Sequence, residues 1–145
     1  MVVALVAFVN HETNGVPQIA NVTSKAAIVE QNREDRVIVR QQQAPHVAKL
    51  MPGVSAIAGL RAAVVRYMDV QIEHGAMAGP VRRSECRFVS GGTSARQLLR
   101  CEVTAAGVTY PFLGVAQPSL GVATYCQRVA PPIPSMDVPV SKRCT

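Results

Sequence analysis

The stretch CRFVSGGTSARQLLRCEV, residues 86–103, carries glycine and hydroxyl residues at its centre and a cysteine near each end. If residues 91–96 form a loop, the flanking segments can pair so that Cys86 lies opposite Cys101 and the apolar residues share one face. Strand register follows the face that can be buried, because a shift of one residue would turn every apolar side chain toward solvent. The stretch therefore predicts an antiparallel hairpin in which the Cα atoms of the two cysteines lie within about 7 Å of each other.

The same register predicts a charged outer face for this hairpin. It sets Arg87 opposite Arg100, and two like charges at facing positions are unfavourable unless an anion or a partner's carboxylate lies between them. We therefore expect an anion contact at these two arginines. A phosphate-binding loop is the alternative for the glycine-rich centre, but the stretch lacks the Lys-Ser/Thr ending of that motif.

The four cysteines, Cys86, Cys101, Cys126 and Cys144, form no CxxC pair, and no histidine lies near any of them. Tetrahedral zinc sites usually draw their ligands in close pairs, so no metal site is predicted. We expect buried free thiols, the usual state in a cytoplasmic product, although an oxidising setting would allow a bridge between Cys86 and Cys101.

Elsewhere the sequence indicates short strands separated by turns. Asn14-Gly15 favours a type I′ turn joining two antiparallel strands over residues 2–10 and 18–24. A short helix is predicted at residues 54–62. Further strands are predicted at residues 26–30, 36–40, 64–72, 103–113 and 120–129, the first two of them as a second hairpin.

These segments predict a mainly β fold of about seven or eight antiparallel strands, arranged as a sandwich or a jelly-roll-like domain over residues 1–129. Residues 130–145 are predicted to form an extended C-terminal arm, because four prolines between positions 131 and 139 can neither continue a helix nor donate regularly to a sheet. We expect this arm to contact another subunit through Pro131, Pro132, Ile133, Pro134, Met136, Val138 and Val140.

Composition and charge narrow the class of protein. Hydrophobic residues make up 48% of the chain and charged residues 17%, which is too apolar for a disordered chain. The net charge is +6, but the basic residues are scattered, which favours a solvated surface over a nucleic-acid-binding arm. The start MVVALVAFVN lacks the features of a signal peptide and is too short to span a bilayer. We expect a soluble chain that is made in a host cytoplasm and has no membrane partner.

The sequence offers little catalytic apparatus. His11, His46 and His74 are the only histidines, and no HExxH, GxSxG or cysteine–histidine signature occurs. No catalytic residue and no cofactor is predicted, although residues distant in sequence can assemble a site that no local motif reveals.

We therefore expect a self-assembling virion structural protein, either a phage coat protein or a capsid-decorating (cement) protein, whose partners are its own copies and other capsid subunits. The plan of a hairpin around Asn14-Gly15 followed by antiparallel strands resembles that of small RNA-phage coat proteins, whereas the proline-rich end departs from them and fits a decoration protein better. The alternative is a small basic β domain that binds nucleic acid through arginines. A third hypothesis is an enzyme with a site assembled from distant residues.

Overall fold

The computed structural model describes residues 24–128 and 138–145 of the chain. The chain divides into two compact units, Met1–Val37 and Ile38–Thr145, and the second contains the whole of the described sheet. The hairpin predicted around Asn14-Gly15 lies outside the described residues.

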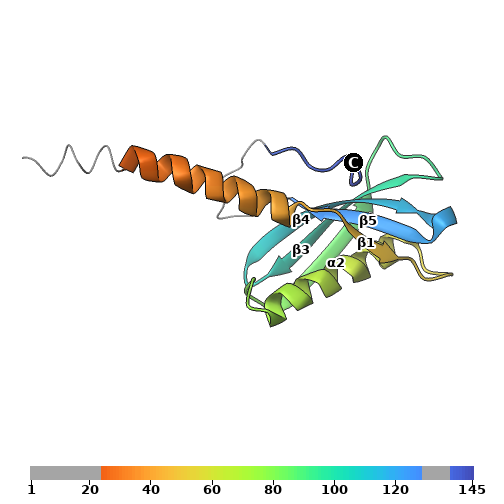
Figure 1. Cartoon of the computed structure of the whole chain (residues 1–145). Coiled ribbons are helices and arrows are strands. Elements are labelled where there is room, and N and C mark those ends of the chain that lie inside the picture. The colour runs from red at the N-terminus through yellow and green to blue at the C-terminus, as the bar shows by residue number, and fades with distance from the viewer. Residues whose placement is uncertain (1–23, 129–137) are drawn as a thin grey trace, which may run out of the picture. The chain divides into compact units, whose positions relative to one another are not determined.

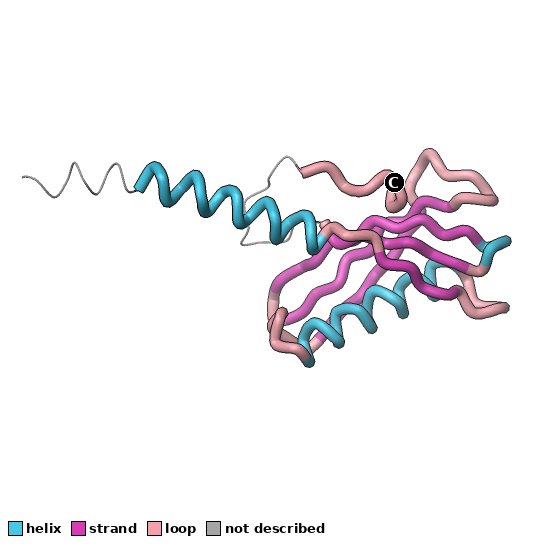
Figure 2. Tube along the Cα trace, viewed as in Figure 1, coloured by secondary structure: helices cyan, strands magenta, loops and turns pink. Residues whose placement is uncertain are grey.

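One antiparallel sheet forms the framework of the second unit (Figure 1). Its strands lie in the order β1-β5-β4-β3-β2, and every neighbouring pair is antiparallel. The mainly β, antiparallel prediction is confirmed, but the described residues form a single sheet with helix α2 on one face, where we expected a sandwich or a jelly roll (Figure 2). The strands are β1 (His46–Lys49), β2 (Val81–Phe88), β3 (Gln97–Ala105), β4 (Val108–Gln117) and β5 (Val122–Gln127), with the 3₁₀ turn η1 (Pro118–Leu120) between the last two.

The hairpin predicted from residues 86–103 is formed by β2 and β3. Cys86 pairs with Cys101 and Arg87 with Arg100, as the expected register requires. The Cα atoms of the two cysteines are 4.0 Å apart, well within the predicted limit. The alternation of buried and half-buried residues along β3 explains why this register forms, because it turns one whole set of apolar side chains toward the core.

Helix α2 (Ala56–Glu73) replaces both the short helix predicted at residues 54–62 and the strand predicted at residues 64–72. Ser55 caps its first turn, where the hydroxyl oxygen accepts a hydrogen bond of 3.2 Å from the backbone N–H of Ala58. The buried residues Leu60, Val64 and Met68 are four apart, a spacing that places them on one face of a helix. The strand prediction was wrong because the apolar residues at 64–72 fit a period of two over a short window as well as a helical one.

A further helix occupies residues 24–42, where we predicted a hairpin of residues 26–30 and 36–40. Within its first part, Arg33 and Glu30 form an ion pair of 4.0 Å, and the side-chain amide of Gln31 donates a hydrogen bond of 3.0 Å to Asp35. Polar pairs three and four residues apart stabilise a helix, because such positions are neighbours on its surface. The segment QNRED, which we took for a polar turn, supplies these pairs.

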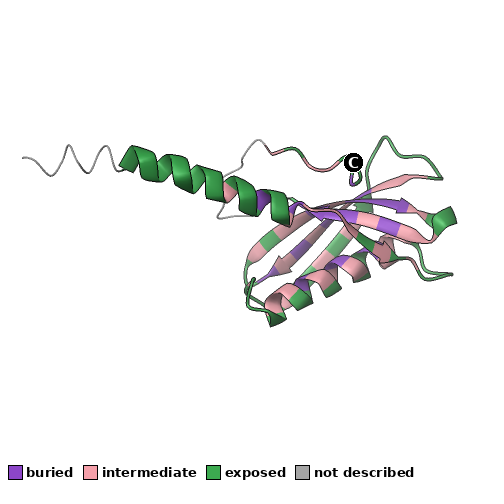
Figure 3. Ribbon diagram, in the orientation of Figure 1, coloured by how far each residue is buried: buried purple, intermediate pink, exposed green. Residues whose placement is uncertain are grey.

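The hydrophobic core lies between α2 and the sheet (Figure 3). Gly114 of β4 allows close approach of the helix, because a Cβ atom at this position would come within 2.6 Å of the Leu60 side chain. The fully buried members of this core are Leu60, Val64, Met68, Leu99, Cys101, Val103, Ala105, Phe112, Ala116 and Ala123.

Both pairs of cysteines form disulfide bonds, so the expectation of free thiols is wrong. Cys86 is bonded to Cys101 between β2 and β3, and Cys126 of β5 is bonded to Cys144. The first bond joins directly facing residues of a hairpin, and the second joins Cα atoms 5.9 Å apart, a usual separation for a disulfide.

The second disulfide fixes the end of the predicted arm to its own domain. The guanidinium of Arg96 also donates hydrogen bonds to the backbone carbonyl oxygens of Lys142 and Thr145. Val138 and Val140 are half-buried. The other predicted contact residues of the arm, Pro131 to Met136, lie outside the described residues.

Candidate protein-docking site

An open groove of about 730 Å³ runs between the edge strand β1 and the exposed side of α2. We call it the β1–α2 groove. Because one wall is a strand edge and the other a helix, the groove offers backbone hydrogen-bonding groups beside apolar side chains. Its lining residues are Val47, Ala48, Lys49, Met51, Val54, Ala58, Gly59, Ala62, Ala63, Arg66, Tyr67, Val70 and Tyr125.

Large apolar side chains are exposed in this groove. The exposed fractions are 71% for Met51, 44% for Val54 and 38% for Val70. Single exposed apolar residues are common on protein surfaces, whereas several gathered in one concave site mark a surface that another molecule covers. The clustering of these three residues is therefore the most informative feature of the described surface.

The backbone of β1 has an open edge beside the groove. Leu50 donates its N–H to the carbonyl oxygen of Gly121 at 2.8 Å, just beyond the last paired residues of β1 and β5. Hydrogen-bonded and non-bonded pairs alternate in an antiparallel ladder, so residues 46 and 48 also bond to β5. The N–H and C=O groups of Val47 and Lys49 consequently point away from β5, and no described strand pairs with them.

The opposite edge of the sheet is protected against pairing. The ladder of β2 and β3 is interrupted by a bulge between Val81 and Arg83. The side chains of Arg82, Arg83, Glu85 and Arg87 are exposed along β2. Bulges and charged side chains are common devices that prevent a further strand from adding to an edge. Of the two edges, β1 is therefore the one suited to accept another strand.

An aromatic cluster supports the floor of the groove. The ring of His46 lies 4.8 Å from that of Tyr67 and 5.4 Å from that of Tyr125, measured between ring centroids. Burial lowers the pKa of His46 and raises the pKa values of both tyrosines. All three rings are therefore uncharged at neutral pH, which keeps the floor apolar.

The rim of the groove is basic. Lys49 and Arg66 line it, and no aspartate or glutamate does. No ion pair is formed by either cation with a described residue. Arg66 is the cation on the α2 side of the groove, whereas Lys49 alternates with His46 and Ala48 along β1 and therefore turns its side chain to the other face of the sheet.

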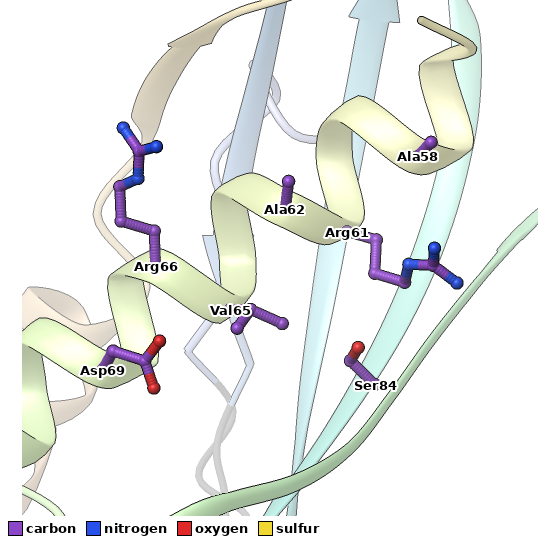
Figure 4. A pocket seen from close by; sticks show the side chains of 7 residues that line it. All are labelled: Ala58, Arg61, Ala62, Val65, Arg66, Asp69 and Ser84. Atoms are coloured by element: carbon purple, nitrogen blue, oxygen red, sulfur yellow. The ribbon is translucent and has the colours of Figure 1, made fainter.

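A second hollow, of about 380 Å³, lies on the other side of the exposed ridge of α2, toward β2. Figure 4 shows Arg61 extending toward Ser84 of β2, while Arg66 points to the opposite side of the helix. Asp69 lies one turn further along. This hollow is lined by three charged residues, three small ones and Val65, and it lacks the exposed large apolar side chains of the β1–α2 groove.

The two arginines predicted to contact an anion lie in a smaller hollow of about 240 Å³. Arg100 is 3.4 Å from Glu102 on the same strand, and Glu85 pairs with Arg83 at 2.5 Å. Arg87 forms no ion pair with a described residue. The two carboxylates offset part of the positive charge here, and the anion contact stays a prediction.

Among the described residues, no three His, Cys, Asp or Glu side chains come close enough together to hold a metal ion. No helix in this part of the chain is long and apolar enough to cross a bilayer.

Comparison with known proteins gives no relative from which a function can be taken: no family model matches the chain, and neither the curated proteins nor the solved structures include a significant match. The groove itself was not found from the sequence, because residues 46–53 gave no clear pattern. The available signal was the apolar residue Met51 directly before the turn residues Pro52-Gly53.

Proposed function

We propose that the chain is a self-assembling structural subunit and that copies join through the β1–α2 groove. The observation that carries this proposal is the gathering of Met51, Val54 and Val70 in one open groove beside a strand edge with which no described strand pairs. Covering these side chains would remove apolar surface from water, at roughly 25 cal/mol per Å². Strand edges are also common sites of association between chains.

A virion shell is the setting that the sequence favours, with the chain as a coat protein or a capsid-decorating protein. The two disulfide bonds agree with such a setting, because disulfides persist in oxidising surroundings, which include virion surfaces. They also support a domain that keeps its shape outside a reducing cytoplasm. The proline-rich arm contributes to the same proposal as an element that reaches a neighbouring subunit.

Sedimentation velocity of the full chain over a wide range of concentrations tests this function. We expect reversible self-association, and we expect Met51→Glu combined with Val54→Glu to shift the chain to the monomer. Phe88→Glu is the matched control, since Phe88 is an exposed apolar residue on the opposite edge strand. A wild-type chain that stays monomeric throughout, or a control that disrupts association equally, would contradict the proposal.

A further inference from the structure

Three connections lie at one end of the sheet, where β1, β4 and β2 finish and β5 and β3 begin (Figure 1). They are residues 50–55 between β1 and α2, residues 89–96 between β2 and β3, and residues 118–121 between β4 and β5. All neighbouring strands are antiparallel, so the strand order places these connections at the same end. We call it the loop end.

The loop end exposes large apolar side chains at each of its connections. The exposed fraction is 66% for Leu120 and 53% for Phe88, the last residue of β2. By contrast, the connections at the opposite end of the sheet, residues 74–80 and 106–107, expose no large apolar side chain. The exposed large apolar residues of the loop end are Met51, Val54, Phe88, Val89 and Leu120.

The loop end is also basic. The three connections and the strand ends beside them comprise residues 49–55, 87–97 and 117–122. They contain Lys49, Arg87 and Arg96 but no aspartate or glutamate. Arg96 donates hydrogen bonds within the chain, whereas Lys49 and Arg87 form no ion pair with a described residue. A partner must therefore cover apolar side chains and bring negative charge, which a second copy meeting end to end would not do.

The exposed apolar side chains stand on separate connections. From β1 to β2 the five strands span roughly 19 Å, at about 4.8 Å between neighbours. A protein partner would need a matching hollow for each connection, whereas the interface of a lipid bilayer is fluid and adapts to separate tips. Binding at such an interface depends on buried apolar area and on the attraction of cations to anionic lipids. Both contributions are present at the loop end.

We propose that the loop end binds the surface of a phospholipid bilayer that contains anionic lipids. Met51, Phe88 and Leu120 enter the interface, and Lys49 and Arg87, each within two residues of a connection, meet the lipid phosphates. The loop backbone stays among the headgroups, because unpaired backbone groups are unstable in the hydrocarbon. We expected no membrane partner because the N-terminal sequence is too short to span a bilayer, whereas this contact comes from connections that only the fold brings together. The proposal goes beyond self-association and does not depend on it.

Co-sedimentation of the full chain with vesicles tests this inference. We expect binding to vesicles of phosphatidylcholine and phosphatidylglycerol, and weaker binding to phosphatidylcholine alone. High salt should remove the difference, because it screens the cations. Leu120→Ser with Phe88→Ser changes no charge and should lower the partition coefficient at least about tenfold, because two apolar side chains no longer enter the interface. Val47→Ser is the matched control, since Val47 is exposed but lies within β1, and it should have no effect.

Charge and insertion can be measured separately. Lys49→Gln with Arg87→Gln should remove the preference for phosphatidylglycerol. The chain contains no tryptophan, so Leu120→Trp introduces a single fluorescent reporter. Its emission should shift to shorter wavelength with anionic vesicles and be quenched by brominated lipid. Val47→Trp should show neither change.

Failure of the wild-type chain to bind anionic vesicles overturns the inference. Binding that salt abolishes, with no shift in the emission of Leu120→Trp, also overturns it, because a basic chain then adsorbs without insertion. If no vesicle is bound and Leu120→Ser weakens self-association, the loop end contacts a second copy, and the inference is again overturned. Self-association through Met51 and Val54 is measured without lipid, so the failure of the proposed function and the failure of this inference are distinguishable.

Discussion

Leu60 of α2 fills the space above Gly114 of β4. A Cβ atom added to Gly114 would lie 2.6 Å from Cδ2 of Leu60 and 3.4 Å from the carbonyl oxygen of Thr124. The helix can lie this close to the sheet because the strand carries no side chain at the point of contact.

We predict that Gly114→Val lowers the free energy of unfolding by about 1–3 kcal/mol, the usual cost of overpacking a core. Leu60→Ala alone should cost about 2–5 kcal/mol, because it opens a cavity. The double variant should lose less unfolding free energy than the two single variants lose together, because alanine at position 60 removes the atoms that the new valine would meet. Urea denaturation of the four proteins measures this coupling, and strictly additive costs would show that the two residues do not compete for space.

The alternation of hydrogen bonds along β1 predicts opposite outcomes for proline at two adjacent positions. Val47→Pro should leave the domain folded, because the N–H that it removes points to the open edge. Ala48→Pro should lower the melting temperature sharply, because it removes a hydrogen bond to β5. Thermal unfolding followed by circular dichroism gives the melting temperature of each variant. An equal decrease in both would show that we have wrongly assigned which N–H groups of β1 bond to β5.

The Cys126–Cys144 disulfide should contribute substantially to stability. Removing it with Cys126→Ala and Cys144→Ala should cost about 3 kcal/mol, given a sequence separation of 18 residues. The measurement is urea denaturation without reductant. Arg96→Ala, which removes hydrogen bonds to the same terminal segment but leaves the bridge intact, is the control and should cost less. Thiol titration of the denatured wild type should find no free thiol.

His46 should make the domain less stable in mild acid. Its pKa is lowered in the folded protein by burial, so the unfolded chain binds the proton more tightly. The contribution of neutral His46 to the free energy of unfolding is therefore fully present above the pKa of histidine in the unfolded chain, about 6.5. It is lost as the pH falls from there through the pKa in the folded protein. His46→Gln should flatten the dependence of the unfolding free energy on pH in this range. An imidazole NMR titration giving His46 a pKa at or above that of the unfolded chain would contradict the prediction.

The sequence predicted those parts of the fold that are determined by residues close together in the chain. The β2–β3 hairpin follows from a short loop between two segments whose apolar residues alternate, and both signals lie within 18 residues. Helix α2 was missed in its second half because Val64, Met68 and Ile72 satisfy both a period of two and a spacing of four. Ser55, as a helix cap, was the local signal that favoured the helix.

The candidate site could not be predicted, because it depends on contacts between distant segments. The backbone of Val47 and the side chain of Val70 line one groove only after β1 has paired with β5 and α2 has packed on the sheet. The same holds for Cys126 and Cys144, whose pairing depends on the path of the chain after β5. Sequence reasoning assigned no strand to residues 46–49 and placed a strand within α2, so it had no means of deciding which edge of the sheet would stay open.

The disulfide between Cys126 and Cys144 has a consequence for proteolysis. Every peptide bond between these two residues lies in a covalent ring, so a protease that cuts once within it releases no fragment. A nicked chain would keep its full mass on a non-reducing gel and separate into two pieces only after reduction. A single cut between these two cysteines would thus leave the distal end attached to the domain that carries it.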